Sequence, residues 1–91
     1  LDYTVSRVLA AQAADELLSI QGIACSFVLF PAQDQIMISA RSLGDINVQM
    51  LLEPLGGGGN PAMAGAQITG KSMNEIIREL VESIDKYFEE D

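Results

Sequence analysis

Residues 53–60 read Glu-Pro-Leu-Gly-Gly-Gly-Gly-Asn, and the four consecutive glycines, Gly56–Gly59, decide how the rest of the chain is interpreted. A glycine within a regular element costs the folded state about 0.5–1 kcal/mol relative to alanine, because its unfolded backbone is so free. A run of four therefore indicates a backbone that approaches another group closely or that adopts positive φ repeatedly. Bare amide N–H groups can form concavities that bind anions, phosphates among them. The alternative is a plain flexible loop, which is disfavoured because the run lies between a predicted helix and a predicted strand.

The residues on either side of the run predict a small α+β domain whose elements follow the order α-β-β-α-β-α. Apolar residues at helical spacing indicate three helices, over residues 5–20, 46–53 and 73 to about 88. Apolar or alternating segments indicate strands over residues 23–30, 35–41 and 63–69. We therefore expect a single domain over residues 1–91, with the helices packed against a small sheet of about three strands.

Particular residues set the limits of these elements. Gly22 ends the first helix, Asp45 caps the second, and Pro31 ends the first strand, so that residues 31–34 form a turn. Ser72 and Glu75 form a capping box that opens the last helix. The helical period assigns the apolar face of the first helix to residues four apart and their neighbours: Val5, Leu9, Ala13 and Leu17, with Val8, Ala11 and Leu18 alongside. That of the second falls on Val48, Leu51, Leu52 and Leu55.

Composition excludes several classes of function. The net charge is −8, with 13 acidic and 5 basic residues, which argues against binding to duplex nucleic acid. The chain has no histidine and one cysteine, so a zinc site and a nucleophile with a histidine base are both excluded. We interpret Cys25 as a buried thiol in a reducing, cytoplasmic protein. No apolar window is long enough to span a membrane, and because the chain opens at Leu1 rather than Met, we expect a piece of a longer or processed protein.

Polar residues near the glycine run form a candidate anion site. The alternation of strand 35–41 places Ser39 beside Arg41, and Arg41 is the only cation between residues 17 and 70. An arginine can grip a phosphate through two parallel hydrogen bonds. Asn47 and Gln49 are further candidates for the site, although they and Arg41 could equally be surface residues. The chemistry of these residues indicates a small anionic ligand.

A second glycine motif is a decoy. Residues 65–72, Gly-Ala-Gln-Ile-Thr-Gly-Lys-Ser, fit the phosphate-binding pattern G-x-x-x-x-G-K-[ST]. That pattern requires a loop between its two glycines, whereas residues 66–69 predict a strand. We interpret it as a strand that ends at Gly70 and a helix that opens at Ser72.

Residues 38–60, ISARSLGDINVQMLLEPLGGGGN, resemble the DHH-associated domain, the C-terminal substrate-binding domain of DHH-family phosphoesterases. The family signature is a glycine run, a histidine and then an Ala-Ala-Gly cluster, and this chain has Gly56–Gly59, Ala64 and Gly65 at matching places. The upstream elements most resemble the branch of bacterial cyclic-di-AMP phosphodiesterases. Two positions depart from the pattern: Asn60 stands where the family has His, and Met63 stands for the first Ala. Because asparagine carries no charge and does not titrate near neutrality, weaker or altered ligand binding is expected.

The resemblance implies a division of labour with an N-terminal DHH domain that is missing here. That domain would hold manganese and hydrolyse the substrate, whereas this fragment would bind a dinucleotide or cyclic dinucleotide, with no cofactor and no catalytic residue of its own. Arg41 would bind phosphate, and the amides of Gly57, Gly58 and Gly59 would bind phosphate or sugar. Ser39 and Asn60 would add supporting hydrogen bonds.

The parent protein is accordingly expected to hydrolyse cyclic-di-AMP or the linear dinucleotide pApA. One alternative is the substrate domain of a nanoRNase or a short single-strand exonuclease. Another is a regulatory or oligomerisation module that has lost ligand binding through the change at Asn60. The resemblance is compatible with a homodimer, and a membrane anchor upstream, frequent in the cyclic-di-AMP branch, would leave this domain facing the cytoplasm.

Overall fold

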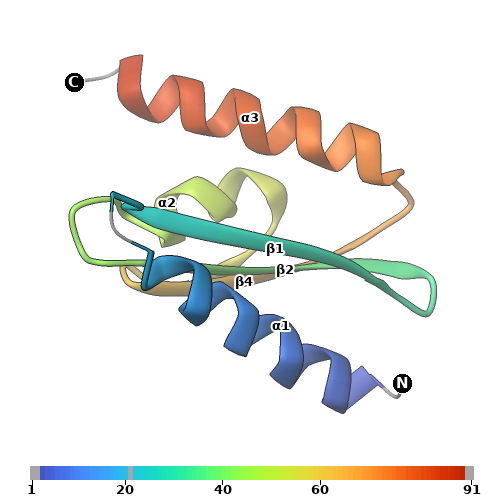
Figure 1. Ribbon diagram of the computed structural model, residues 1–91. Helices are drawn as coiled ribbons and strands as arrows, with labels where there is room; N and C mark the ends of the chain where they lie inside the picture. Colours follow the sequence, from blue (N-terminus) through green and yellow to red (C-terminus); the bar gives the residue numbers. More distant parts are fainter. Residues whose placement is uncertain (1–2, 21, 90–91) are drawn as a thin grey trace.

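The computed structural model describes residues 3–20 and 22–89, and within them it shows a four-stranded antiparallel sheet between two layers of helix (Figure 1). The elements in chain order are α1 (Tyr3–Leu18), β1 (Cys25–Ala32), β2 (Gln35–Ser42), α2 (Val48–Leu52), the 3-10 turn η1 (Glu53–Leu55), β3 (Gly58–Asn60), β4 (Met63–Thr69) and α3 (Met73–Glu89). The order of the strands in space is β1-β2-β4-β3. The predicted α+β class is confirmed, but the prediction of about three strands was one strand short.

The additional strand, β3, is formed by the glycine run itself. Gly58 and Gly59 lie opposite Gly65 and Ala64 of β4 in an antiparallel pair. A side chain at Gly57 would place its Cβ 2.5 Å from the carbonyl oxygen of Gly65, and one at Gly59 would meet the backbone of β4. The predicted order of elements missed this strand because glycine is rare in strands. Here glycine is required at residues 57 and 59, because an added Cβ at either residue would overlap atoms of β4.

Helices α2 and α3 cover one face of the sheet, and the main core lies beneath them (Figure 1). The sheet and the two helices contribute buried apolar side chains from every layer: Ile38, Ala40, Val48, Leu51, Leu52, Leu55, Ala64, Ala66, Ile68, Ile76 and Leu80. The face predicted for the second helix is thus confirmed at all four of its residues. This layer ends in α3, whose predicted capping box is present: Ser72 and Glu75 exchange hydrogen bonds of 3.1 and 3.2 Å.

Helix α1 covers the opposite face, and it does so through small residues (Figure 1). Ala10 and Ala14 are buried, and the carbonyl of Ala14 accepts a hydrogen bond of 2.7 Å from the hydroxyl of Ser26 in β1. The predicted apolar face was wrong at the residues with large side chains, since Leu9 and Leu17 are almost half exposed. The side chain of Val5 lies outside the described ones. Two faces of this helix carry apolar residues at helical spacing. The face that packs on the sheet is the one with the small residues.

Several predicted limits also differ from the structure. α1 spans residues 3–18 rather than 5–20, so it ends before Gly22. β1 continues through Pro31 to Ala32, because β1 is an edge strand, where a residue without an N–H is tolerated. The turn is therefore only Gln33 and Asp34.

The start of α2 is set by Asn47 instead of Asp45. The side-chain oxygen of Asn47 accepts a hydrogen bond of 3.1 Å from the amide of Met50. The amide of Asn47 in turn donates to the hydroxyl of Tyr87, 3.0 Å away, which fixes the chain at this residue. Among the described residues, no helix has the length and apolar character that crossing a bilayer demands.

Candidate functional site

A cleft of about 780 Å³ opens on the face of the sheet that α1 covers only in part. Helix α1 packs mainly against β1 and β2, and β4 and β3 continue the sheet beyond it. The wall of the cleft is formed by Arg7, Val8 and Ala11 of α1, and the opposite rim by the glycine run. The structure thus brings the predicted residues Ser39, Arg41 and Gly57–Gly59 to one cavity.

The floor of the cleft follows from the register of three strands. Ser39 of β2 lies opposite Gly65 of β4, and Gly65 lies opposite Gly58 of β3. Because paired residues share a face, none of these three positions raises a side chain larger than a hydroxymethyl group into the cleft. We call this row of three residues the trough.

Two rows of larger side chains border the trough. Arg41 and Met63 are paired on one side of it, and Met37 and Gln67 are paired on the other. Each row lies two residues along the strand from the trough, so the two rows are about 13 Å apart at the backbone. This spacing leaves a channel between the two rows, bordered by the polarizable thioethers of Met37 and Met63.

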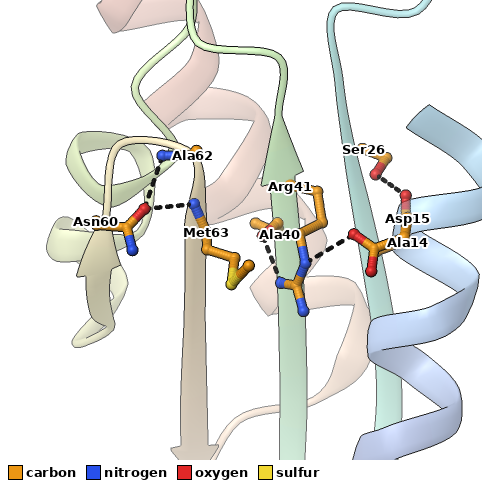
Figure 2. A network of polar contacts seen from close by, with 8 residues as sticks. All are labelled: Ala14, Asp15, Ser26, Ala40, Arg41, Asn60, Ala62 and Met63. Carbon is orange, nitrogen blue, oxygen red and sulfur yellow. Dashed lines mark hydrogen bonds and ion pairs between the residues drawn. The ribbon is translucent and has the colours of Figure 1, made fainter. Parts of the chain in front are cut away.

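Arg41 is the polar anchor of the cleft (Figure 2). Its side chain is 14% exposed; its Nε donates to the Asp15 carboxylate at 3.0 Å, and its Nη1 donates to the carbonyl of Ala40 at 2.8 Å. Nη2 makes no hydrogen bond with the side chains described from residue 7 onward, so this group can donate to an anion.

The residues of the glycine run differ in the reason why each lacks a side chain. Gly57 and Gly59 lack side chains because β4 and α2 lie against them. A Cβ added at Gly58 would meet no atom within 4 Å, and its φ is not positive. The fold therefore does not require glycine at residue 58, and the missing side chain leaves the trough open.

Asn60 is the last residue of β3, directly before the β3–β4 turn, and it is not among the described residues that line the cleft (Figure 2). Its Oδ1 accepts hydrogen bonds of 3.0 Å from the amides of Ala62 and Met63, so it fixes this turn. Asn47 and Gln49 belong to the α2 layer on the other face of the sheet, where Asn47 serves as a helix cap, and the structure does not bring them to the cleft. An asparagine directly before a proline is a turn signal, so the pair Asn60-Pro61 could have predicted this role of Asn60 from the sequence.

Sequence patterns missed the residues that α1 and β4 contribute to the cleft, such as Arg7, Val8 and Met63. The alternation of β2 did place Met37 on the same face as Ser39 and Arg41. Among the described residues of the lining, the arginines are the only charged ones, whereas the whole chain carries −8. The lining is thus suited to an anion. The described residues contain no group of three or more His, Cys, Asp or Glu side chains that could hold a metal ion.

Comparison with known proteins gives a consistent result over almost the whole chain. The family profile of the DHHA1 domain matches residues 2–90. The chain is 48% identical over 84 residues to the cyclic-di-AMP phosphodiesterase GdpP of Geobacillus thermodenitrificans and 46% identical over 84 residues to GdpP of Bacillus subtilis. It is 44% identical over 88 residues to the cyclic-di-AMP phosphodiesterase PdeA of Listeria monocytogenes. These alignments cover 91%, 91% and 96% of this chain, which spans 13% of the length of each relative.

Proposed function

This chain belongs to the DHHA1 domain family, and we propose that it is the nucleotide-binding domain of a DHH-type phosphodiesterase that hydrolyses cyclic-di-AMP or pApA. The observation that carries this proposal is the trough of Ser39, Gly65 and Gly58, which lies directly beside Arg41. A channel beside a guanidinium suits a nucleotide, whose base or sugar is broad and whose phosphate is anionic.

Each group in the cleft has a distinct part in this binding. The Nη2 of Arg41 donates to a phosphate oxygen, and the amides of Gly58 and Gly59 donate to phosphate or sugar. The amide of Gly57 is already occupied, because it donates to the carbonyl of Leu52 at 2.9 Å. The hydroxyl of Ser39 lies at the floor, where it can donate or accept. Asn60 adds a donor at the edge of the site through its side-chain nitrogen, because its oxygen is already occupied by the turn.

Hydrolysis and manganese belong, in this proposal, to the DHH domain of the parent protein. No group of side chains in the described part of this chain fits a metal ion, so no chemical step is assigned to it. We expect the chain alone to form no product when it is mixed with manganese and cyclic-di-AMP. Product formation at the rate of an enzyme, followed by chromatography, would contradict the proposal.

Binding is tested by an NMR titration of the chain with cyclic-di-AMP, pApA and a short RNA. We expect cyclic-di-AMP or pApA to shift the amide signals of residue 39, residue 41 and residues 57–59. Arg41→Ala should weaken binding about 10- to 100-fold, because a hydrogen bond to a charged group contributes about 1.5–3 kcal/mol. Arg78→Ala is the matched control, since it removes the same charge from the exposed surface of α3 on the far side of the sheet.

The outcome separates the proposal from its alternatives. Preference for the RNA over both dinucleotides would favour the substrate domain of a nanoRNase or short single-strand exonuclease. An absence of shifts at millimolar concentrations of all three ligands would contradict a binding function and favour a regulatory or oligomerisation module.

A further inference from the structure

Asp15 joins helix α1 to the candidate site through a single contact (Figure 2). Its Oδ1 lies 3.0 Å from Nε of Arg41, across the gap between α1 and β2. Sequence separates the two residues by 26 positions, and only the packing of α1 on the sheet brings them together. Asp15 is not part of the cleft lining, so it can affect a ligand only through Arg41 or through its charge, not by direct contact.

The location of Asp15 is fixed by the residue before it. Ala14 is fully buried, and its carbonyl accepts the hydrogen bond of 2.7 Å from the hydroxyl of Ser26. This contact anchors the middle of α1 on β1 and sets the distance from Asp15 to β2. The carboxylate therefore stands on a rigid support, although 62% of its side chain is exposed to water.

The two hydrogen bonds of Arg41 fix the plane of its guanidinium. Asp15 holds the Nε side, and the carbonyl of Ala40 holds one N–H of Nη1 at 2.8 Å. The remaining donors lie on the Nη1–Nη2 edge, which is one of the edges that a guanidinium uses to grip a phosphate with two hydrogen bonds. Without Asp15 the long side chain would sample several rotamers, and a ligand would have to order it.

We propose that Asp15 is a positioning residue, which orients the Nη1–Nη2 edge of Arg41 toward the cleft before the ligand arrives. This inference rests on the proposed function, because it assumes that Arg41 binds an anionic group of a nucleotide. Asp15 touches no ligand itself. It lowers the entropic cost of binding, although its own negative charge works against an anion.

These two effects of Asp15 have opposite signs, so the sign of the measured change decides between them. If the charge of Asp15 dominated, its removal would strengthen the binding of an anion. If positioning dominates, its removal weakens binding by about 3- to 10-fold, the cost of ordering one long side chain. An exposed ion pair contributes little to stability, so variants at Asp15 should fold as the natural chain does.

The test measures the dissociation constant of cyclic-di-AMP for the natural chain and for Asp15→Ala, Asp15→Asn and Glu16→Ala. Asp15→Ala is expected to weaken binding about 3- to 10-fold. Asp15→Asn keeps an oxygen that accepts from Nε, and it should bind at least as tightly as the natural chain. Glu16→Ala is the matched control, because it removes the neighbouring exposed carboxylate without touching Arg41.

A spectroscopic measurement accompanies the binding data. The Nε–H signal of Arg41 should be slow to exchange with water in the natural chain and in Asp15→Asn, and fast in Asp15→Ala. Asp15→Ala that binds as tightly as the natural chain, or more tightly, would overturn the positioning role while leaving the proposed function intact. If the natural chain binds no nucleotide, the proposed function fails and the positioning role fails with it.

Discussion

The two faces of the sheet differ in what they bury. The face beneath α2 and α3 carries the main core, which includes Ile38, Leu52 and Ile76. The face beneath α1 buries mostly small or polar groups, such as Ala10, Ala14 and Ser26, and part of it stays open as the cleft. One set of strands thus supplies stability from one face and a binding surface from the other, because successive residues of a strand point to opposite faces.

Single residues of the glycine run also differ in which face of the sheet they serve. Gly57 and Gly59 point toward the core face, where neighbouring atoms leave no room for a side chain. Gly58, between them, points to the cleft, where there is room. The difference shows that a run of identical residues can meet two independent requirements, one of the fold and one of the site.

The largest effect is expected from a core substitution on the α2–α3 face. Leu52→Ala should lower the free energy of unfolding by about 2–5 kcal/mol, because Leu52 is fully buried and its loss leaves a cavity. Leu9→Ala is the control on the other face, since Leu9 is 48% exposed, and it should change stability little. Urea unfolding checks both values. Equal losses would contradict the placement of the main core beneath α2 and α3.

A smaller effect on stability is expected to distinguish Gly57 from its neighbour Gly58. Gly57→Ala should destabilise the fold by about 1–3 kcal/mol, because the new methyl group would overlap the Gly65 carbonyl and Ala66. Gly58→Ala should leave stability unchanged or raise it by up to about 1 kcal/mol, and it should weaken nucleotide binding by filling the trough. Thermal unfolding and the dissociation constant of cyclic-di-AMP are measured on both variants. Gly58→Ala with unaltered binding would remove the trough from the site.

The smallest effect on stability is expected at the N-terminus of α3, and it depends on pH. Hydrogen bonds from the backbone and side chain of Ser72 lower the pKa of Glu75 in the folded chain. Its stabilising contribution is therefore complete above the unfolded pKa of glutamate, about 4.3, and is lost as the pH falls through the lower folded value. Glu75→Gln should flatten the pH dependence of the urea midpoint between about pH 5 and pH 3. A steeper dependence in this variant would contradict the assignment.

Sequence patterns predicted the structure correctly at residues on which only one structural requirement acts. The capping box at Ser72 and the core face of α2 were both predictable, because a single local rule decides each of them. Sequence patterns failed where two alternatives satisfied the local rules and tertiary packing decided between them. α1 could have buried Leu9 and Leu17, and either Asp45 or Asn47 could have capped α2; contacts with Ser26 and Tyr87 favour the observed choices.

The candidate site was predictable in part for the same reason. Alternation along β2 placed Ser39 and Arg41 on one face, and the glycine run suggested a close backbone approach. The trough itself depends on the pairing of β2 with β4 and of β4 with β3, which no local pattern reveals. The contact of Asp15 with Arg41 depends on how α1 lies across the sheet, which is equally invisible in the sequence.

Helix α1 contributes no described residue to the main core, and this has a consequence for how ligand binding is coupled to local opening of the helix. Lifting α1 from the sheet breaks far fewer apolar contacts than global unfolding does. A ligand that touches both the α1 wall and the sheet binds only the seated form, and by mass action it raises the free energy of opening. Amide exchange in α1 should therefore slow as nucleotide is added, by the factor 1 + [L]/Kd. This helix would then report occupancy of the cleft.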